Sequence, residues 1–111
     1  MTFLKEKSMF DINILDIKRA KETLLISRNP LKIKLFPAKE KRKYILLGMI
    51  CLLFDKDKKY TEPEVNEILR DVYDDFVTIR RYLIIYEFLA RTTNGSSYWL
   101  IADQTQFQDY K

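Results

Sequence analysis

The sequence predicts an α+β fold, a winged-helix-like domain, from the order of three helical patterns and one hairpin pattern. Apolar residues recur at helical spacing through residues 38–54, a strong helix start follows at Thr61, and a third helix opens at Asp74. Two short strand-like segments around the dipeptide Asn-Gly, a favoured hairpin turn, come next. Three helices with a C-terminal β-hairpin, the wing, form a winged-helix core. We expect this core to span residues 31–102, followed by a tail at 103–111.

Residues 1–30 are expected to form a helical extension in front of this core. Apolar residues recur at roughly helical spacing from Phe10 to Ile26, whereas residues 1–9 lack periodicity and are expected to be frayed. The helix should break at the dipeptide Asn29-Pro30. Two arrangements stay open: the extension packs on its own domain, or it exchanges with a second copy of the chain.

The core is expected to begin with one extended segment and a central helix. The run LKIKLF at residues 31–36 alternates between apolar and lysine positions, which predicts a short strand or an extended segment lying on the core. Nearly every position after Tyr44 in the helix at residues 38–54 is apolar, so we expect this helix to be buried on most sides. The single cysteine, Cys51, should act there as a small hydrophobe.

The second and third helices carry clear N-terminal signals. Thr61 is expected to be an N-cap, Glu64 completes a capping box, and Pro63 lies in the first turn, where its missing N–H costs little. Asp74 and Asp75 place acidic caps at the positive end of the third helix dipole. An acid–base pair is the other interpretation of these two aspartates, and their position at a helix start favours capping.

The composition argues against an enzyme or a metalloprotein. The chain has no histidine and one cysteine, and its sequence shows no Gly-rich phosphate loop, nucleophile–base pair or ligand cluster. We therefore expect no catalytic residue, no metal and no cofactor. The basic run at residues 39–43 precedes an apolar run that is too short for a bilayer-spanning helix of about 20 residues. We expect a soluble, cytoplasmic protein without membrane contact.

One ordered set of motifs covers most of the chain. Basic residues follow Pro37, YTEPEVNEIL begins at Tyr60, and later come Asp74-Asp75, IRRYLI from Ile79, Arg91, and Gly95 with Tyr98. With these motifs, residues 31–99 resemble the DUF2087 family, bacterial domains of unknown function that occur alone or behind helix-turn-helix domains of predicted transcriptional regulators. The family pattern favours Asp and Gly where this chain has Ile85 and Glu87. The resemblance implies a winged-helix-like fold and a regulatory setting, without an established activity.

Charge is unevenly distributed along the chain. Residues 1–43 hold 12 Lys or Arg and 5 Asp or Glu, whereas residues 44–111 hold 8 and 11. Positive charge in the first turns of the helix at 38–54 lies at the positive end of the helix dipole, which lowers stability by about 0.3–1 kcal/mol per residue. This charge has two interpretations. It forms a surface that binds phosphate or an acidic protein, or it is a solvated charged face. The six cations of this region are Lys32, Lys34, Lys39, Lys41, Arg42 and Lys43.

The outward side of the third helix is expected to carry Thr78, Arg81, Tyr82 and Ile85. Arg81 can bind a guanine edge or a phosphate, and the hydroxyl groups of Thr78 and Tyr82 can hydrogen-bond phosphates. The tip of the wing, TTNGSS, has no cation. Ile85 beside Tyr82 makes a small apolar-aromatic spot that suits a protein interface.

Arg80 is expected at the edge of the apolar face of the same helix, about 40° from Phe76 on an ideal wheel. Two interpretations stay open: a half-buried arginine held in an ion pair, or a phosphate clamp. The candidate partners for the ion pair are Asp74, Asp75 and Glu64.

The sequence therefore predicts a transcriptional regulator or regulatory module with a winged-helix-like DNA-binding domain. Double-stranded DNA would be contacted by the six cations between Lys32 and Lys43, together with Thr78, Arg81 and Tyr82. Six phosphate contacts would give a log–log salt slope of about 5, with little dependence on base sequence. The alternative is a protein–protein interaction module without direct DNA binding, whose partner is a regulatory protein or a second copy of the chain.

Overall fold

The computed structural model describes residues 10–110, and the expectation for residues 1–9 lies outside this part of the chain. The described residues form an α+β fold with two small antiparallel sheets, as predicted. None of the described helices has the length and apolar content that a membrane crossing requires. In chain order the elements are α1 (Ile14–Leu24), β2 (Leu25–Arg28), β3 (Leu31–Ile33), α2 (Glu40–Cys51), β4 (Lys59–Tyr60), α3 (Glu62–Arg70), α4 (Phe76–Ile85), β5 (Leu89–Arg91), β6 (Tyr98–Leu100) and the 3₁₀ helix η1 (Gln104–Tyr110).

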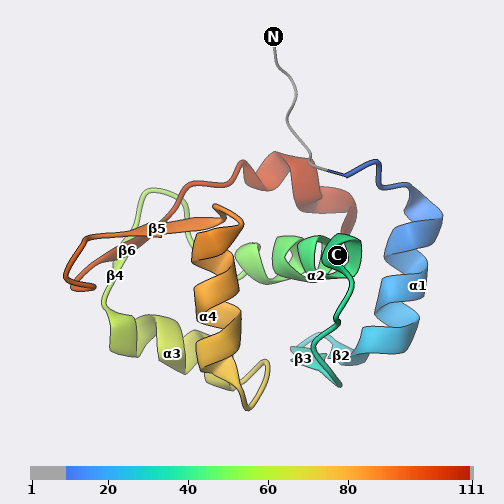
Figure 1. Ribbon diagram of the computed structural model, residues 1–111, viewed down its shortest axis with the longest axis horizontal. Coiled ribbons are helices and arrows are strands. Elements are labelled where there is room, and N and C mark those ends of the chain that lie inside the picture. Colours follow the sequence, from blue (N-terminus) through green and yellow to red (C-terminus); the bar gives the residue numbers. More distant parts are fainter. Residues whose placement is uncertain (1–9, 111) are drawn as a thin grey trace, which may run out of the picture.

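The arrangement from α2 to β6 is winged-helix-like, as predicted. Helices α2, α3 and α4 precede the β5–β6 hairpin, and β4 pairs with β6 to give the strand order β4-β6-β5. Figure 1 shows this sheet beside the α3–α4 pair, at the end of the molecule away from α1. Strand β4 was not predicted, because Lys59 and Tyr60 directly follow a charged loop and their pairing depends on residues far along the chain.

Helix α2 lies at the centre of the molecule, as its apolar sequence predicted. Every residue from Tyr44 to Cys51 is buried. Helix α1 packs on one side, α4 crosses on the other, and η1 runs along it (Figure 1). Gly48 permits the close approach of η1, because a Cβ atom at this position would lie 2.6 Å from Cδ1 of Phe107. The helix ends at Cys51, three residues before the predicted end.

The C-terminal tail, for which the sequence suggested no element, forms η1 and covers one side of α2. Phe107 and Tyr110 are buried, and their ring centroids lie 5.2 Å apart. The side-chain amide of Gln104 donates to the carbonyl oxygens of Cys51 and Phe54, at 2.9 and 2.7 Å. These bonds join the start of η1 to the last residue of α2 and to the turn that follows it.

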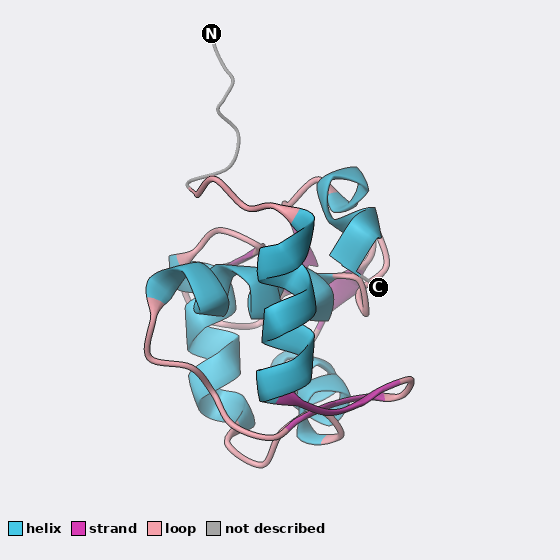
Figure 2. Cartoon of the chain, turned by 90° about the vertical axis from the view of Figure 1, so that its right-hand side faces the viewer, coloured by secondary structure: helices cyan, strands magenta, loops and turns pink. Residues whose placement is uncertain are grey.

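Helix α1 is shorter than the predicted helix and turns directly into a strand, as Figure 2 shows at its lower end. It begins with a capping box, in which Asn13 and Asp16 each accept the other's backbone N–H at 2.9 and 3.0 Å. Residues 25–28, expected to close the helix, form β2 and pair with β3. The spacing of apolar residues in this segment is compatible with a helix or a strand, and the pairing with β3 makes it a strand. The boundary placed at residue 30 therefore falls inside one hairpin.

The starts of α3 and α4 follow the prediction. Thr61 and Glu64 form the expected capping box, which lowers the pKa of the Glu64 carboxyl group through its bond from the Thr61 backbone N–H. Asp75 is the N-cap of α4 and accepts the backbone N–H of Thr78 at 3.3 Å. The prediction of aspartate capping is thus confirmed at Asp75.

The turn of the wing differs from the predicted two-residue Asn-Gly turn. The N–H of Thr92 donates to the carbonyl of Ser97 at 2.9 Å, so four residues lie between the paired positions. Of these four, Gly95 alone has a positive φ, at 74°. The Thr92 hydroxyl accepts the N–H groups of Ser96 and Ser97 at 3.0 and 3.1 Å, and these bonds hold the wider loop.

Candidate functional site

The N-terminus of α2 carries positive charge without a side-chain cap. Lys39 is the N-cap residue and makes no capping hydrogen bond, whereas α1, α3 and α4 are each capped by a side chain. Lys39, Arg42 and Lys43 occupy positions i, i+3 and i+4, which makes them neighbours on one side of the helix. Within residues 10–110, the side chains of Lys39 and Arg42 take part in no ion pair or hydrogen bond.

Lys43 joins this end of α2 to α4. Its Nζ atom lies 4.6 Å from the ring centroid of Tyr82 and 3.3 Å from the phenol oxygen. Two aromatic rings also contact it: Phe36 is stacked at 5.2 Å, and Tyr86 lies edge-on with its centroid 6.0 Å away. The structure therefore brings together two of the predicted DNA-binding residues, Lys43 and Tyr82. A cation over an aromatic face is stabilised by about 0.5–1 kcal/mol at an exposed site, and its charge remains available to an anion.

Two of the six predicted cations are engaged with other elements of the fold. Lys32 Nζ donates to the carbonyl of Asp71 at the end of α3, at 2.8 Å. Lys41 Nζ lies 2.9 Å from Oδ2 of Asp16 on α1, and this bond holds the pKa of that carboxyl group below its ordinary value. Lys34 is exposed on the segment after β3. We call the three neighbouring cations at the N-terminus of α2 the basic edge: Lys39, Arg42 and Lys43.

The outer face of α4 is apolar on both sides of a single arginine. Val77, Arg81 and Ile85 follow one another at intervals of four residues, and Val77 and Ile85 are 40% and 64% exposed. Arg81 makes no hydrogen bond or ion pair with any described residue. Thr78 is not available as a phosphate donor in this arrangement, because its hydroxyl donates to the carboxylate of Asp75 at 2.7 Å.

Tyr82 and Ile85, predicted to form a common spot, lie one turn apart on α4 and differ in their surroundings. Tyr82 is half-buried, with Phe36 stacked on its ring and Lys43 close to it, whereas Ile85 projects into solvent. Arg81, one turn before Ile85, is exposed, whereas Ile84 is half-buried. The apolar surface of α4 therefore extends toward the wing rather than toward α2.

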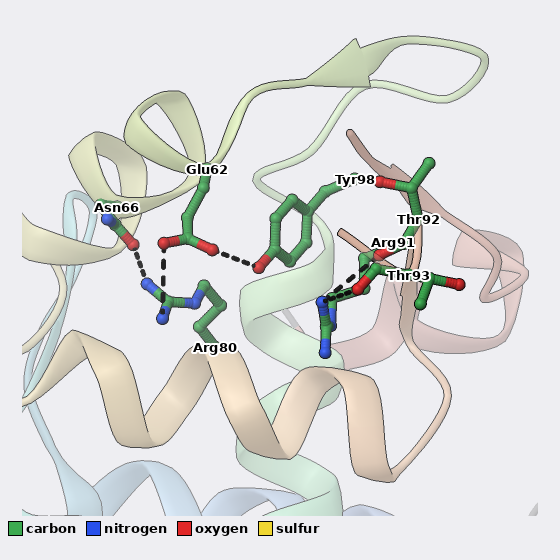
Figure 3. A network of polar contacts seen from close by, with 7 residues as sticks. All are labelled: Glu62, Asn66, Arg80, Arg91, Thr92, Thr93 and Tyr98. Atoms are coloured by element: carbon green, nitrogen blue, oxygen red, sulfur yellow. Dashed lines mark hydrogen bonds and ion pairs between the residues drawn. The ribbon is translucent and has the colours of Figure 1, made fainter. Parts of the chain in front are cut away.

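Arg80 is the centre of a polar network that joins α3, α4 and the wing (Figure 3). Its guanidinium group donates to Oδ1 of Asn66 and lies 3.8 Å from Oε2 of Glu62, and its side chain is only 16% exposed. The other carboxylate oxygen of Glu62 accepts the hydroxyl of Tyr98 at 2.7 Å. Burial, followed by this bond to Glu62, raises the pKa of Tyr98.

Arg80 is half-buried and held in an ion pair, in line with the first of its two interpretations. Its partner is none of the three predicted carboxylates. Asp75 and Glu64 are engaged as helix caps, and the ion pair of Arg80 in the described residues is formed with Glu62. Glu62 and Asn66 lie one turn apart on the side of α3 that faces α4. No local sequence signal identifies them, because the contact depends on how the two helices cross.

A hollow of about 340 Å³ lies between α4 and the wing. Arg80, Arg81, Ile84 and Ile85 line it from α4, Arg91 lines it from β5, and Glu62 and Tyr98 complete the wall. Arg91 donates to the carbonyls of Thr92 and Thr93, each at 3.3 Å, and is held at the base of the wing. The sequence alone does not show that Arg80, Arg81 and Arg91 line one hollow, because Arg91 lies on a different element.

Of the comparisons with known proteins, one identifies a family. Within residues 10–110, no group of three or more Cys, Asp or Glu side chains is placed to hold a metal ion. Neither the curated proteins nor the solved structures contain a match to the chain. The model of DUF2087, described as an uncharacterized protein conserved in bacteria, matches residues 32–100, from β3 to the end of β6. The chain therefore belongs to the DUF2087 family.

Proposed function

We propose that the protein is a transcriptional regulatory module that contacts the phosphate backbone of duplex DNA through the basic edge. The observation that carries this proposal is the uncapped, positively charged N-terminus of α2, which lies beside Tyr82 of α4. Stability alone would favour an acidic or neutral cap at Lys39. The proposed role is non-enzymatic, and a protein that contacts bacterial DNA acts in the cytoplasm.

The contact is expected to depend little on base sequence. Helix α4, which would enter the major groove in a typical winged helix, presents one arginine between two apolar side chains and has Asp74 and Asp75 at its N-terminus. Phosphate contacts position a protein on DNA without reading its bases. Three phosphate contacts by the basic edge would give a salt slope of about 3, lower than the value for six cations.

The substitution Lys39→Asp tests the proposal, because it separates binding from folding. Removing the cation and adding an acid should weaken binding to a random-sequence duplex by roughly tenfold at low salt. The same change should raise the free energy of unfolding by about 1 kcal/mol, since aspartate can cap α2 where Lys39 does not. Fluorescence anisotropy and urea unfolding measure the two effects.

The matched control is Lys56→Asp, which makes the same charge change in the exposed loop before β4. Duplex affinity of this variant should stay within about twofold of the native value, since the loop lies away from the N-terminus of α2. Equal losses in both variants would show that binding follows net charge alone. Unchanged affinity in Lys39→Asp would remove the basic edge as the contact surface.

A further inference from the structure

We propose that the outer face of α4, together with the hollow beside the wing, binds an acidic and apolar segment of a partner protein. We call this surface the arginine–isoleucine face and define it as Val77, Arg81, Ile84, Ile85 and Arg91. It is separate from the basic edge, which lies on the other flank of α4 beyond Tyr82. The site adds a second partner to the proposed contact with DNA.

The type of cation is the first argument. The hollow is lined by three arginines and, among the described residues, by no lysine. The basic edge, in contrast, holds two lysines and one arginine. Arginine is enriched and lysine depleted at protein interfaces, because the guanidinium group is weakly hydrated and binds carboxylates through two parallel hydrogen bonds. The composition of the hollow thus fits a protein carboxylate.

The balance of charge gives the second argument. Glu62 is the only acid among the described residues that line the hollow, and it already serves Arg80 and Tyr98. Arg81 has no partner within residues 10–110, and Arg91 binds only neutral carbonyl oxygens. Two guanidinium groups are therefore left without a counter-charge at the mouth of the hollow. A partner that brings carboxylates supplies the complementary charge.

The apolar flanks give the third argument. Val77 and Ile85 lie eight residues apart on α4, about 12 Å along the helix axis, with Arg81 between them. A segment that places apolar side chains on both sides of an acid can cover Val77 and Ile85 while its carboxylate meets Arg81. The network of Glu62, Arg80 and Tyr98 fixes the walls in advance, which lowers the ordering cost of binding.

Nucleic acid fits this face less well than it fits the basic edge. The exposed isoleucine and valine would lie against charged phosphates or sugars, and the tip of the wing offers only uncharged side chains. Covering Ile85 with an apolar group removes surface from water, at roughly 25 cal/mol per Å². A phosphodiester chain cannot supply that group at the spacing of Val77 and Ile85.

Three synthetic peptides of about 12 residues test the proposal by NMR titration of the ¹⁵N-labelled full chain. The first repeats Leu-Glu-Ser, the second repeats Ser-Glu-Ser and the third repeats Leu-Lys-Ser. The first peptide should shift the amide signals of Val77, Arg81 and Ile85 and the side-chain Nε signals of Arg81 and Arg91. The other two peptides should bind at least about tenfold more weakly, because each lacks one half of the recognition.

Variants of exposed residues locate the binding without disturbing the fold. Arg81→Ala and Ile85→Ser should each weaken the first peptide about five- to tenfold, since each removes a central contact. Lys39→Asp should leave peptide binding unchanged, so failure of this proposal is distinguishable from failure of DNA binding.

Four results would overturn the proposal. The first is absence of shifts with the first peptide up to about 1 mM. The second is peptide binding that is insensitive to Arg81→Ala and Ile85→Ser. The third is a stronger response of the same signals to a short DNA duplex, which would make the face a nucleic-acid surface. The fourth is a peptide-free dimer that Ile85→Ser dissociates, which would make a second copy of the chain the occupant.

Discussion

Glu87 adopts a backbone conformation that normally favours glycine. Helix α4 ends at Ile85, Tyr86 is the C-cap, and the next residue, Glu87, has a φ of 62°. The N–H groups of Glu87 and Phe88 donate to the carbonyls of Ile84 and Leu83 at 3.0 and 2.8 Å. This is the hydrogen-bond pattern of a Schellman motif, in which glycine is the usual residue at the left-handed position.

Replacing Glu87 by glycine should therefore stabilise the protein. We predict that Glu87→Gly raises the free energy of unfolding by about 1 kcal/mol, because glycine adopts a positive φ without the steric cost of a Cβ atom. Urea unfolding measures the change. The control, Glu67→Gly at an exposed interior position of α3, should lower the same quantity by about 1 kcal/mol. A loss of stability in both variants would contradict the left-handed backbone at Glu87.

Adjacent arginines on α4 are expected to differ in their effect on stability. Arg80→Ala should lower the free energy of unfolding by about 1–2 kcal/mol, since Glu62 and Asn66 lose a largely buried partner. Arg81→Ala should change it by less than about 0.5 kcal/mol, because Arg81 contacts solvent. Chemical unfolding of the two variants checks this difference. If Arg80→Ala lowers the free energy of unfolding as little as Arg81→Ala does, the network around Arg80 contributes nothing to folding.

The buried thiol and phenol make stability depend on alkaline pH. Burial raises the pKa of Cys51 from 9.0 to about 12 and the pKa of Tyr110 from 10.0 to about 12. A raised pKa means that the folded state holds its proton more tightly than the unfolded state. The contribution of both groups is therefore complete below about pH 9 and is lost as the pH rises toward 12.

Unfolding midpoints measured between pH 7 and pH 11 should accordingly be constant at first and fall above about pH 9.

A thiol reagent should also react with Cys51 at pH 8 only as fast as the protein unfolds, because the thiolate is scarce and covered. Immediate reaction of the folded protein would place Cys51 at the surface.

At the scale of elements, η1 is expected to be essential to the fold. Phe107 fits against Gly48 of α2 and contacts Tyr44 and Phe88, with ring centroids 5.9 and 5.3 Å away. We predict that Phe107→Ala lowers the free energy of unfolding by about 3–5 kcal/mol. Gln108→Ala, at an exposed position of the same element, is the control and should change it by less than about 0.5 kcal/mol. Native stability in Phe107→Ala would show that η1 is not part of the core.

Elements with local signals were predictable, and elements that depend on distant partners were not. Helices α3 and α4 carry their own caps at Thr61 and Asp75, so their starts follow from a few neighbouring residues. Strands β2 and β4 exist because β3 and β6 pair with them, and η1 exists because α2 offers a surface at Gly48. Apolar residues in short segments do not reveal such partners by their spacing.

The same distinction applies to the candidate site. The sequence identified the cations near α2 and the outward residues of α4, because both follow from local position on a helix. It could not show that Lys32 and Lys41 bind to α3 and α1, or that Arg80 pairs with Glu62. Nor could it show that Arg81 and Arg91 share a hollow. These relations depend on how α1, α3, α4 and the wing pack.

On the scale of the whole molecule, α4 separates two surfaces of different chemistry. On one flank of α4, Tyr82 contacts Lys43 of the basic edge. On the other flank, Arg81 and Ile85 face the hollow beside the wing. The proposed module can therefore hold DNA phosphates at one surface and a partner protein at the other. Such an arrangement suits a regulator that joins a protein to DNA without reading a base sequence itself.

The most direct test of the proposed function is the salt dependence of duplex binding by the native chain. A fluorescent random-sequence duplex would be titrated with protein as salt is raised from about 50 to 200 mM. We predict binding at low salt whose logarithmic affinity falls with a slope of about 3, as expected for three phosphate contacts. Absence of binding at about 50 mM salt with tens of micromolar protein would contradict the proposal that this chain contacts DNA.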